Sequence, residues 1–464
     1  MNKEKSQMLR YMNIKKLLIK LAIPSILAMT VNALYNLVDT IFVSQSEGRD
    51  AIGALTIAYP IQLIILAIGL MLGVGSASVF SRAFGRKDID TMKKSVNTAI
   101  FLNVSLTLTI SFFTYLFLED LLLLFGAVPE NINYARDYLL IILIALIPFS
   151  LSVMMNNLTR AEGRVKIAMW SLVIGAGVNI VLDPLFIFDW GLGLGIQGAA
   201  YATAIGKTAA FIFIFGQALS KKSSLAIDLK YIIKPSMKVG KEVIAVGLPS
   251  FARVAMGALL IIVVNNLIKR YAFDSDEAAM YQSIYAVINR LLRFSLMAGF
   301  GLVQGMVPII GYNFGAKIYE RVHGVLKFAS LLLLGYFTFA LIGVMVFAPN
   351  LFEIFTKGED LVANAEFIKF GAQAFRIVAL GFAFITYQVV LSSSYQAMGY
   401  PVRAFIVALS RRFILFIPIA YLLTHLIGVD GIWWTFVAAD VIAGLGSFIV
   451  YVFEMKQLKT RFTG

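Results

Sequence analysis

Long apolar stretches recur along the whole chain and are separated by short polar segments. A membrane-spanning helix needs about 20 consecutive apolar residues. Twelve stretches reach that length: 19–43, 52–80, 99–118, 138–158, 167–188, 194–219, 243–268, 279–310, 326–347, 370–395, 404–426 and 429–453. The pattern predicts an all-α integral membrane protein with twelve transmembrane helices.

The composition agrees with a membrane protein and excludes several kinds of site. Hydrophobic residues make up 59% of the 464 residues and charged residues only 14%, whereas soluble domains carry about 25% charged residues. Because the chain has no cysteine and two histidines, it cannot hold a disulfide, an iron–sulfur centre, a thiolate zinc site or a multi-histidine metal site. The basic first 20 residues lead into a full-length span, so we expect a cytoplasmic arm rather than a cleaved signal peptide.

The net charge of +14 is concentrated in alternate loops. Basic residues cluster at 3–20, 82–94, 160–166, 221–241, 317–327, 403–412 and 456–461, and the intervening loops at 47–50, 119–137, 189, 274–277 and 359–366 are acidic or mixed. Cytoplasmic loops of membrane proteins carry such an excess of lysine and arginine. We therefore expect a multi-pass protein of the inner or plasma membrane, in contact with the lipid bilayer and not with nucleic acid, with both termini cytoplasmic.

The two halves of the chain carry matching motifs in the same order. Pro24-Ser25 matches Pro249-Ser250, and residues 84–87, 161–163 and 195–198 match 314–317, 397–399 and 428–431, at offsets of 225 to 236. The polar stretch 220–241 lies between the halves, so we predict two parallel-repeat six-helix lobes around a central cavity, 1–225 and 226–464. Parallel repeats are typical of transporters that bind substrate between the halves. A channel or a membrane enzyme is the alternative, but no catalytic motif is present.

Two acidic residues of the first half lie inside predicted spans. Asp39 and Asp183 fall toward the outer ends of the first and fifth spans, where an ionisable group costs about 3 kcal/mol and is usually functional. Asn179 is one turn before Asp183 and shares its helix face, and Pro184 cannot donate to the carbonyl of Ile180. These oxygens suit a hard cation, or a proton if desolvation raises the carboxyl pKa. In the alternative interpretation, Asp183 only caps or pins a kinked helix end and Asp39 hydrogen-bonds a neighbour.

Other residues inside the spans can be interpreted as structural. Pro24 marks either a bend or the start of the first helix. The second half has no acid matching the first, and Asp440 is its nearest candidate. Its arginines are expected to reach toward the interface or pair with carbonyls rather than bind anions; they are Arg253, Arg290, Arg293 and Arg376.

Over essentially its whole length, the chain resembles the multidrug and toxic compound extrusion (MATE) family. The motifs that carry the resemblance are LAIP at 21–24, YNLVDT at 35–40, NIVLDP at 179–184, GIQGAAYAT at 195–203 and PIIGYNFGA at 308–316. The chain is most similar to the prokaryotic branch whose coupling acids lie in the N-terminal lobe. The acidic C-lobe site of another branch is not visible in this sequence.

This resemblance implies a V-shaped, two-lobed antiporter that works by alternating access. It would exchange small organic cations and drugs for sodium ions or protons, with no further cofactor, and we expect a monomer. The residues of the implied cation-coupling site are Asp39, Asp183, Asn179, Thr203 and Tyr138, of which Asp39, Asn179, Asp183 and Thr203 are the implied sodium ligands. Tyr35 and Asn156 would line the adjoining cavity.

The alternative function is that of other proteins with a related fold. Lipid-linked saccharide flippases of the wider exporter superfamily need a basic cavity for pyrophosphate, and Arg253, Arg290 and Arg293 would fit that need. Because an oxygen-rich site serves sodium ions and protons alike, both coupling ions remain alternatives.

Overall fold

In this computed structural model the backbone is described for residues 3–46, 48–125, 132–356 and 361–463; the side chains of 3, 33, 35–41, 43–46, 48–57, 258, 275, 361–363 and 462–463 lie outside the description. The described backbone is almost entirely helical and contains no strand. The helices are α1 (Lys3–Tyr11), α2 (Ile14–Ser46), α3 (Gly48–Arg86), α4 (Ile89–Leu116), α5 (Leu118–Leu124), α6 (Ile132–Ala161), α7 (Val165–Ile187), α8 (Gly195–Leu219), α9 (Leu229–Ile233), α10 (Met237–Tyr271), α11 (Ser275–Gly315), α12 (Tyr319–Glu353), α13 (Leu361–Ala379), α14 (Phe382–Met398), α15 (Pro401–Leu409), the π-helical segment η1 (Ser410–Leu415), α16 (Phe416–Ile427) and α17 (Asp430–Thr463).

The predicted membrane spans correspond to these helices. Within the described residues, ten helices are long and apolar enough to cross a membrane, and the bent pair of α13 and α14 makes an eleventh span. Helix α2, with 33 residues, covers the predicted first span. The prediction of an all-helical membrane protein is confirmed.

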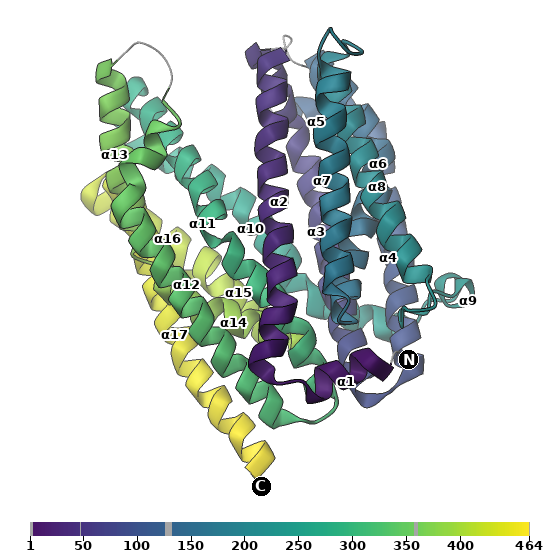
Figure 1. Ribbon diagram of the computed structural model, residues 1–464. Helices are drawn as coiled ribbons and strands as arrows, with labels where there is room; N and C mark the ends of the chain where they lie inside the picture. The colour runs from purple at the N-terminus through teal and green to yellow at the C-terminus, as the bar shows by residue number, and fades with distance from the viewer. Residues whose placement is uncertain (1–2, 47, 126–131, 357–360, 464) are drawn as a thin grey trace.

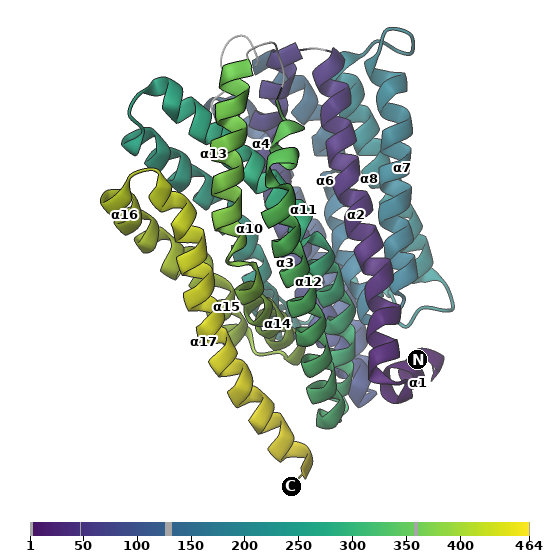
Figure 2. The same ribbon diagram turned by 60° about the vertical axis from the view of Figure 1, so that its left-hand side comes forward.

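The helices form two lobes. Helices α2 to α8 make up one group, the N-lobe, and α10 to α17 the other, the C-lobe (Figure 1 and Figure 2). Both termini lie at one end of the molecule, called the terminus side below, and the lobes diverge toward the opposite end, the far side (Figure 1). This is the expected V shape. The division of the chain at residue 225 stays a prediction.

Glycines let the two lobes approach closely on the terminus side. A Cβ atom added at Gly305 of α11 would lie 2.7 Å from the backbone nitrogen of Ala22 on α2. In the same way, Gly75 of α3 lies against the carbonyl of Val243 on α10. Small residues at helix crossings in membranes allow this backbone contact. The pairs α2–α11 and α3–α10 therefore join the lobes.

Two predicted spans are less regular than the sequence suggested. The span expected at 370–395 is broken between α13 and α14 and bent by 48°, and the span expected at 404–426 contains η1. Both irregular segments lie next to Asp440 of α17. A Cβ added at Gly381, in the break, would lie 2.5 Å from Asp440 Oδ2. Arg411 of η1 forms an ion pair with the same carboxylate. Both departures from a regular helix therefore lie against the same buried acid.

Pro24 lies inside a continuous helix. Helix α2 begins at Ile14, ten residues before Pro24, so the interpretation of Pro24 as a helix start is wrong. A bend at Pro24 stays a prediction.

Candidate functional site

Helices α7 and α8 of the N-lobe pack closely through glycine. A Cβ added at Gly206 of α8 would lie 2.7 Å from the carbonyl oxygen of Gly175 and 3.0 Å from Cβ of Asn179, both on α7. Only a residue without a side chain permits this approach. The contact sets the polar side chains of the two helices within hydrogen-bonding reach of each other.

A buried polar group lies between these helices. The side-chain amide of Asn179 donates to Asp183 Oδ1 at 3.0 Å and lies 3.3 Å from Thr203 Oγ1 on α8. Asp183 is fully buried, and the other two side chains are 2% and 3% exposed. The Asn179 Oδ1 atom has no hydrogen-bond partner among the described residues. A buried acceptor without a donor costs free energy, which a bound cation or a proton on the neighbouring carboxylate would recover.

The oxygens of this group match the preferences of a small hard cation. Asp183, Asn179 and Thr203 offer carboxylate, amide and hydroxyl oxygens, the kinds of ligand that hard cations prefer. Pro184 follows Asp183 inside α7 and has no N–H to donate to the carbonyl of Ile180. The arrangement can bind a sodium ion or hold a proton on Asp183.

Three other predicted site residues lie on neighbouring helices. Tyr138 of α6 is 4% exposed and packs in an apolar cluster with Ile187 of α7 and Ile196 of α8. Asp39 and Tyr35 lie on α2, which packs along α7, but their side chains fall outside the described residues. Their roles stay predictions.

Asn156, the other residue predicted to line the cavity, joins two helices. Its amide donates to the carbonyl of Ala168 at 2.7 Å and to Ser171 Oγ at 2.8 Å. Both amide hydrogens therefore hold α6 against α7, and a role in lining a cavity stays a prediction.

One charged residue inside the N-lobe, Lys207, was not predicted from the sequence. Lys207 lies on α8 one turn after Thr203; its ammonium donates to Gln62 Oε1 of α3 at 2.7 Å and lies 4.2 Å from the ring centroid of Phe149 on α6. A lone lysine in the apolar stretch 194–219 was the available signal. The Lys207 ammonium is thus held against α3 and α6 within the N-lobe, where its charge opposes the entry of another cation.

Charged side chains inside the C-lobe are bonded to other side chains. Its buried acid, Asp440, forms an ion pair with Arg411, whose Nη2 lies 3.3 Å from Oδ2. Arg253 donates to Ser250 Oγ and Gln396 Oε1, both at 3.0 Å.

Arg376 donates to the carbonyl of Met345 at 3.0 Å. This bond agrees with the structural role expected for it.

Known proteins are similar to this chain in sequence and in fold. The MatE family model matches residues 24–185 and 252–422, one stretch in each lobe. The chain belongs to the MATE family. Members of this family are transporters and not enzymes, and the chain is accordingly a multi-pass transporter of the plasma membrane.

Relatives match the MATE chain over nearly its whole length. A protein of Staphylococcus haemolyticus described as multidrug export protein MepA is 27% identical over 441 residues, which cover 95% of this chain and 94% of that protein. A protein of Staphylococcus aureus with the same description is 25% identical and covers 94% and 93%.

Solved structures match the fold as a whole. One is described as the outward-facing conformation of a multidrug resistance MATE family transporter of the MOP superfamily; it has a TM-score of 0.89 and 25% identity, and the match covers 99% of this chain and 100% of that one. A structure of a MATE protein in the straight conformation gives the same TM-score, identity and coverage.

Proposed function

We propose that this MATE protein is a cation-coupled antiporter that exports organic cations and drugs across the cytoplasmic membrane by alternating access. The observation that carries the proposal is the buried group of Asp183, Asn179 and Thr203. A carboxylate that is fully buried in a membrane lobe is costly and is typical of ion pathways. The relatives described as multidrug export proteins support drugs as the cargo.

The coupling ion is sodium or a proton, and it acts in the N-lobe. In the proposed mechanism the ion neutralises Asp183 and satisfies the oxygen of Asn179, which changes the packing of α7 against α8. Asp39 and Tyr138 would complete the site from α2 and α6. Inward movement of one charge across 100 mV supplies about 2.3 kcal/mol. Exchange of one such ion for one monovalent drug cation is electroneutral, so it is driven by the ion's concentration gradient alone.

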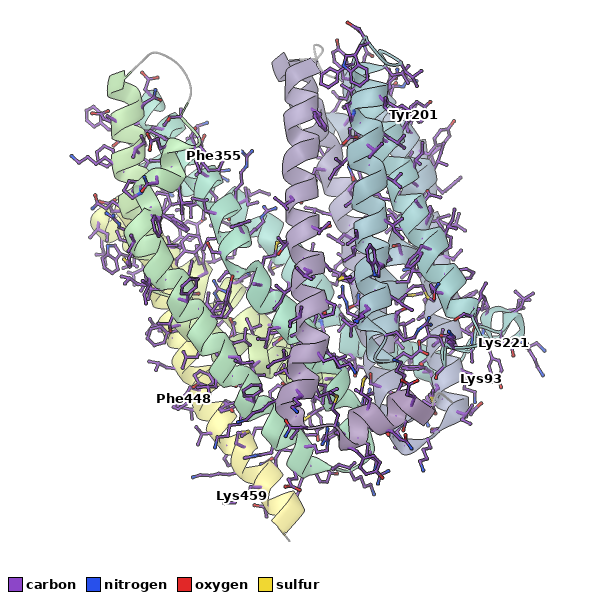
Figure 3. All side chains as sticks on the ribbon, viewed as in Figure 1. Lys93, Tyr201, Lys221, Phe355, Phe448 and Lys459 are labelled. Atoms are coloured by element: carbon purple, nitrogen blue, oxygen red, sulfur yellow. The ribbon has the colours of Figure 1, made fainter. Side chains whose placement is uncertain are left out.

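The proposed orientation places both termini in the cytoplasm. Lys93, Lys221 and Lys459 all lie toward the terminus side (Figure 3), and an excess of lysine and arginine marks the cytoplasmic face. The glycine contacts that join the lobes lie on this same side. The arrangement is therefore taken as outward-facing, with the protein acting as a monomer.

Dye efflux from proteoliposomes tests the function. Purified protein is reconstituted, loaded with a fluorescent organic cation, and given a sodium gradient or a proton gradient separately. We expect one of the two gradients to accelerate efflux, whereas no acceleration by either would refute coupled export. An arm with a pyrophosphate-linked lipid tests the flippase alternative, which Arg253 supports because its described partners, Ser250 and Gln396, are uncharged.

A further inference from the structure

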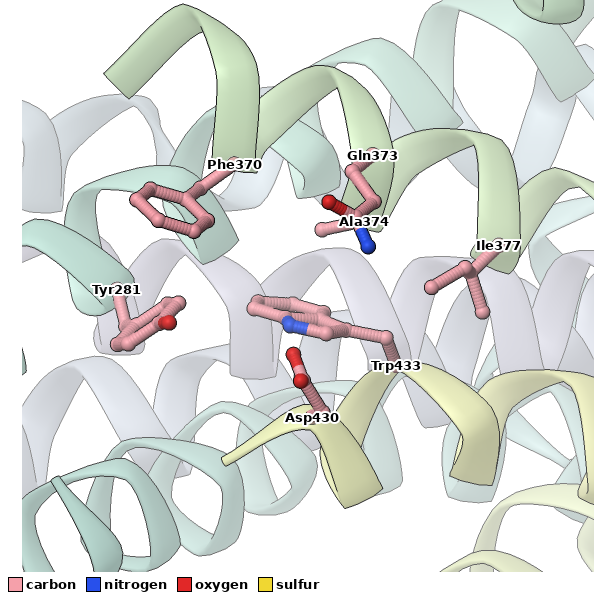
Figure 4. Close-up of a pocket in the computed structure, with 7 residues that line it drawn as sticks. All are labelled: Tyr281, Phe370, Gln373, Ala374, Ile377, Asp430 and Trp433. Carbon is pink, nitrogen blue, oxygen red and sulfur yellow. The ribbon is translucent and has the colours of Figure 1, made fainter. Parts of the chain in front are cut away.

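A small pocket lies in the C-lobe on the far side, away from the N-lobe polar group. Tyr281 of α11, Phe370 of α13 and Trp433 of α17 contribute three aromatic rings to it, and Asp430 and Gln373 contribute polar groups (Figure 4). The Tyr281 ring centroid lies 6.3 Å from that of Phe370 and 6.4 Å from that of Trp433. The rings therefore form an aromatic wall around one space.

A carboxylate faces this wall. Figure 4 shows the Asp430 carboxylate and the Gln373 amide pointing toward Trp433 from opposite sides. Among the described residues neither Asp430 nor Gln373 has a hydrogen bond or an ion pair. Asp430 is exposed and forms no ion pair with a described lysine or arginine, and the Lys369 ammonium lies 5.8 Å from the Phe370 ring centroid.

The equivalent residues of the N-lobe are joined to each other by a hydrogen bond. With the offsets of the matched motifs, 236 and 233, Asp137 corresponds to Gln373 and Gln197 to Asp430. In the N-lobe, Gln197 donates to Asp137 Oδ2 at 2.8 Å. In the C-lobe the acid and the amide have exchanged helices, and no such bond is made. The C-lobe also has Trp433 where the N-lobe has Ala200, so the aromatic wall is a property of the C-lobe alone.

Aromatic faces and one carboxylate select a particular chemistry. Aromatic faces attract ammonium groups through their quadrupoles, and tryptophan does so most strongly. Asp430 disfavours anions, and one carboxylate is too few ligands for a divalent metal ion. The cavity of about 60 Å³ is far smaller than a drug pocket of roughly 300–1,000 Å³. It accommodates the head of an organic cation rather than the whole molecule.

We propose that Tyr281, Phe370, Trp433 and Asp430 form a binding site for the methylated ammonium head of an organic cation. The site lies near the far end of the C-lobe and is separate from the group around Asp183. It rests on the proposed cation export only for the identity of its physiological ligand. Binding itself needs no gradient.

A fluorescence titration tests the site directly. In the full chain in detergent, Trp170, Trp190 and Trp434 are replaced by Phe, which leaves Trp433 as the reporter among the four tryptophans. Choline supplies a trimethylammonium head, and 3,3-dimethylbutan-1-ol is its neutral isostere. We expect a saturable change with choline and at least tenfold weaker binding of the alcohol. Calorimetric titration of the unmodified chain checks that the replacements did not create the site.

Matched variants assign the binding to the pocket. Asp430→Asn is expected to weaken choline binding about tenfold, since it removes the only charge, whereas Asp430→Glu should retain most of it. Phe370→Leu should weaken binding several-fold, and Phe273→Leu should change nothing because Phe273 is 95% exposed on the same side. Equal binding of the alcohol, or an unchanged affinity in Asp430→Asn, overturns the proposal.

Failure of the site and failure of the transport function give different results. Asp183→Asn should bind choline normally in this pocket. If the unmodified protein shows no gradient-driven efflux but binds choline through Asp430, the proposed function is wrong and the site stands. If efflux is normal and choline does not bind, the site is wrong and the function stands.

Discussion

Gly85 and Gly315 make the same contact from opposite lobes. Gly85 of α3 lies against the carbonyl of Tyr312 on α11, and Gly315 of α11 lies against the carbonyl of Arg82 on α3. Both residue pairs are related by one offset, 230 residues, so the two lobes meet here with approximate two-fold symmetry. Each backbone fills the space that the other's missing side chain leaves.

Gly85→Ala should destabilise this arrangement of the lobes. The added methyl group would overlap the carbonyl of Tyr312, and overpacking of this kind costs about 1–3 kcal/mol. We expect a lower melting temperature in detergent and slower transport. Gly335→Ala is the matched control, because a Cβ added there meets nothing within 4 Å. Equal melting temperatures for the two variants would contradict the close contact.

Lys207→Met should strengthen cation binding in the N-lobe. Lys207 follows Thr203 by four positions of α8, about 6 Å along the helix, so its positive charge opposes a cation held in the N-lobe. We expect roughly a tenfold lower sodium or proton concentration for half-maximal coupled efflux. Lys207→Arg keeps the charge and should behave like the unmodified protein. An unchanged concentration in Lys207→Met would show that the ammonium does not act on the site.

Thr203→Val should weaken the coupling site without abolishing it. The substitution keeps the shape of the side chain but removes the hydroxyl oxygen that lies 3.3 Å from the Asn179 amide. Loss of one ligand or hydrogen bond costs about 1 kcal/mol, so the ion concentration for half-maximal efflux should rise about fivefold. Thr203→Ser restores the oxygen and should restore the affinity. If both variants behave alike, the hydroxyl has no part in coupling.

Labelling of single cysteines in cells should reveal the orientation. The chain has no cysteine of its own, so each introduced one reports alone. Cysteine in place of Phe273, on the far side, should react with an impermeant maleimide added outside. Cysteine in place of Lys221, on the terminus side, should react only after the membrane is opened. The reverse result would place the termini outside the cytoplasm.

The sequence predicted the parts of the fold that depend on local pattern. Span positions follow from runs of apolar residues, and the bond between Asn179 and Asp183 follows from their spacing on one helix. Thr203, by contrast, was named through a family resemblance, because nothing in α8 itself shows that it faces α7. The features missed involve partners far away in the chain: the break at Gly381 and the π-helical segment both lie against Asp440. Local periodicity carries no information about such partners.

We expect Asp183 to couple ion entry to export, and gradient-driven efflux of a cationic dye from proteoliposomes measures this coupling. Asp183→Asn keeps the size of the side chain and one oxygen that can accept from the Asn179 amide, but it removes the charge that a sodium ion or a proton would neutralise. Asp39→Asn, on α2, is expected to behave the same way, and Asp120→Asn, an exposed acid of α5, is the control. We expect efflux driven by the imposed gradient to be lost in Asp183→Asn and normal in Asp120→Asn, with equal amounts of folded protein. Gradient-driven efflux at the unmodified rate in Asp183→Asn would contradict this coupling.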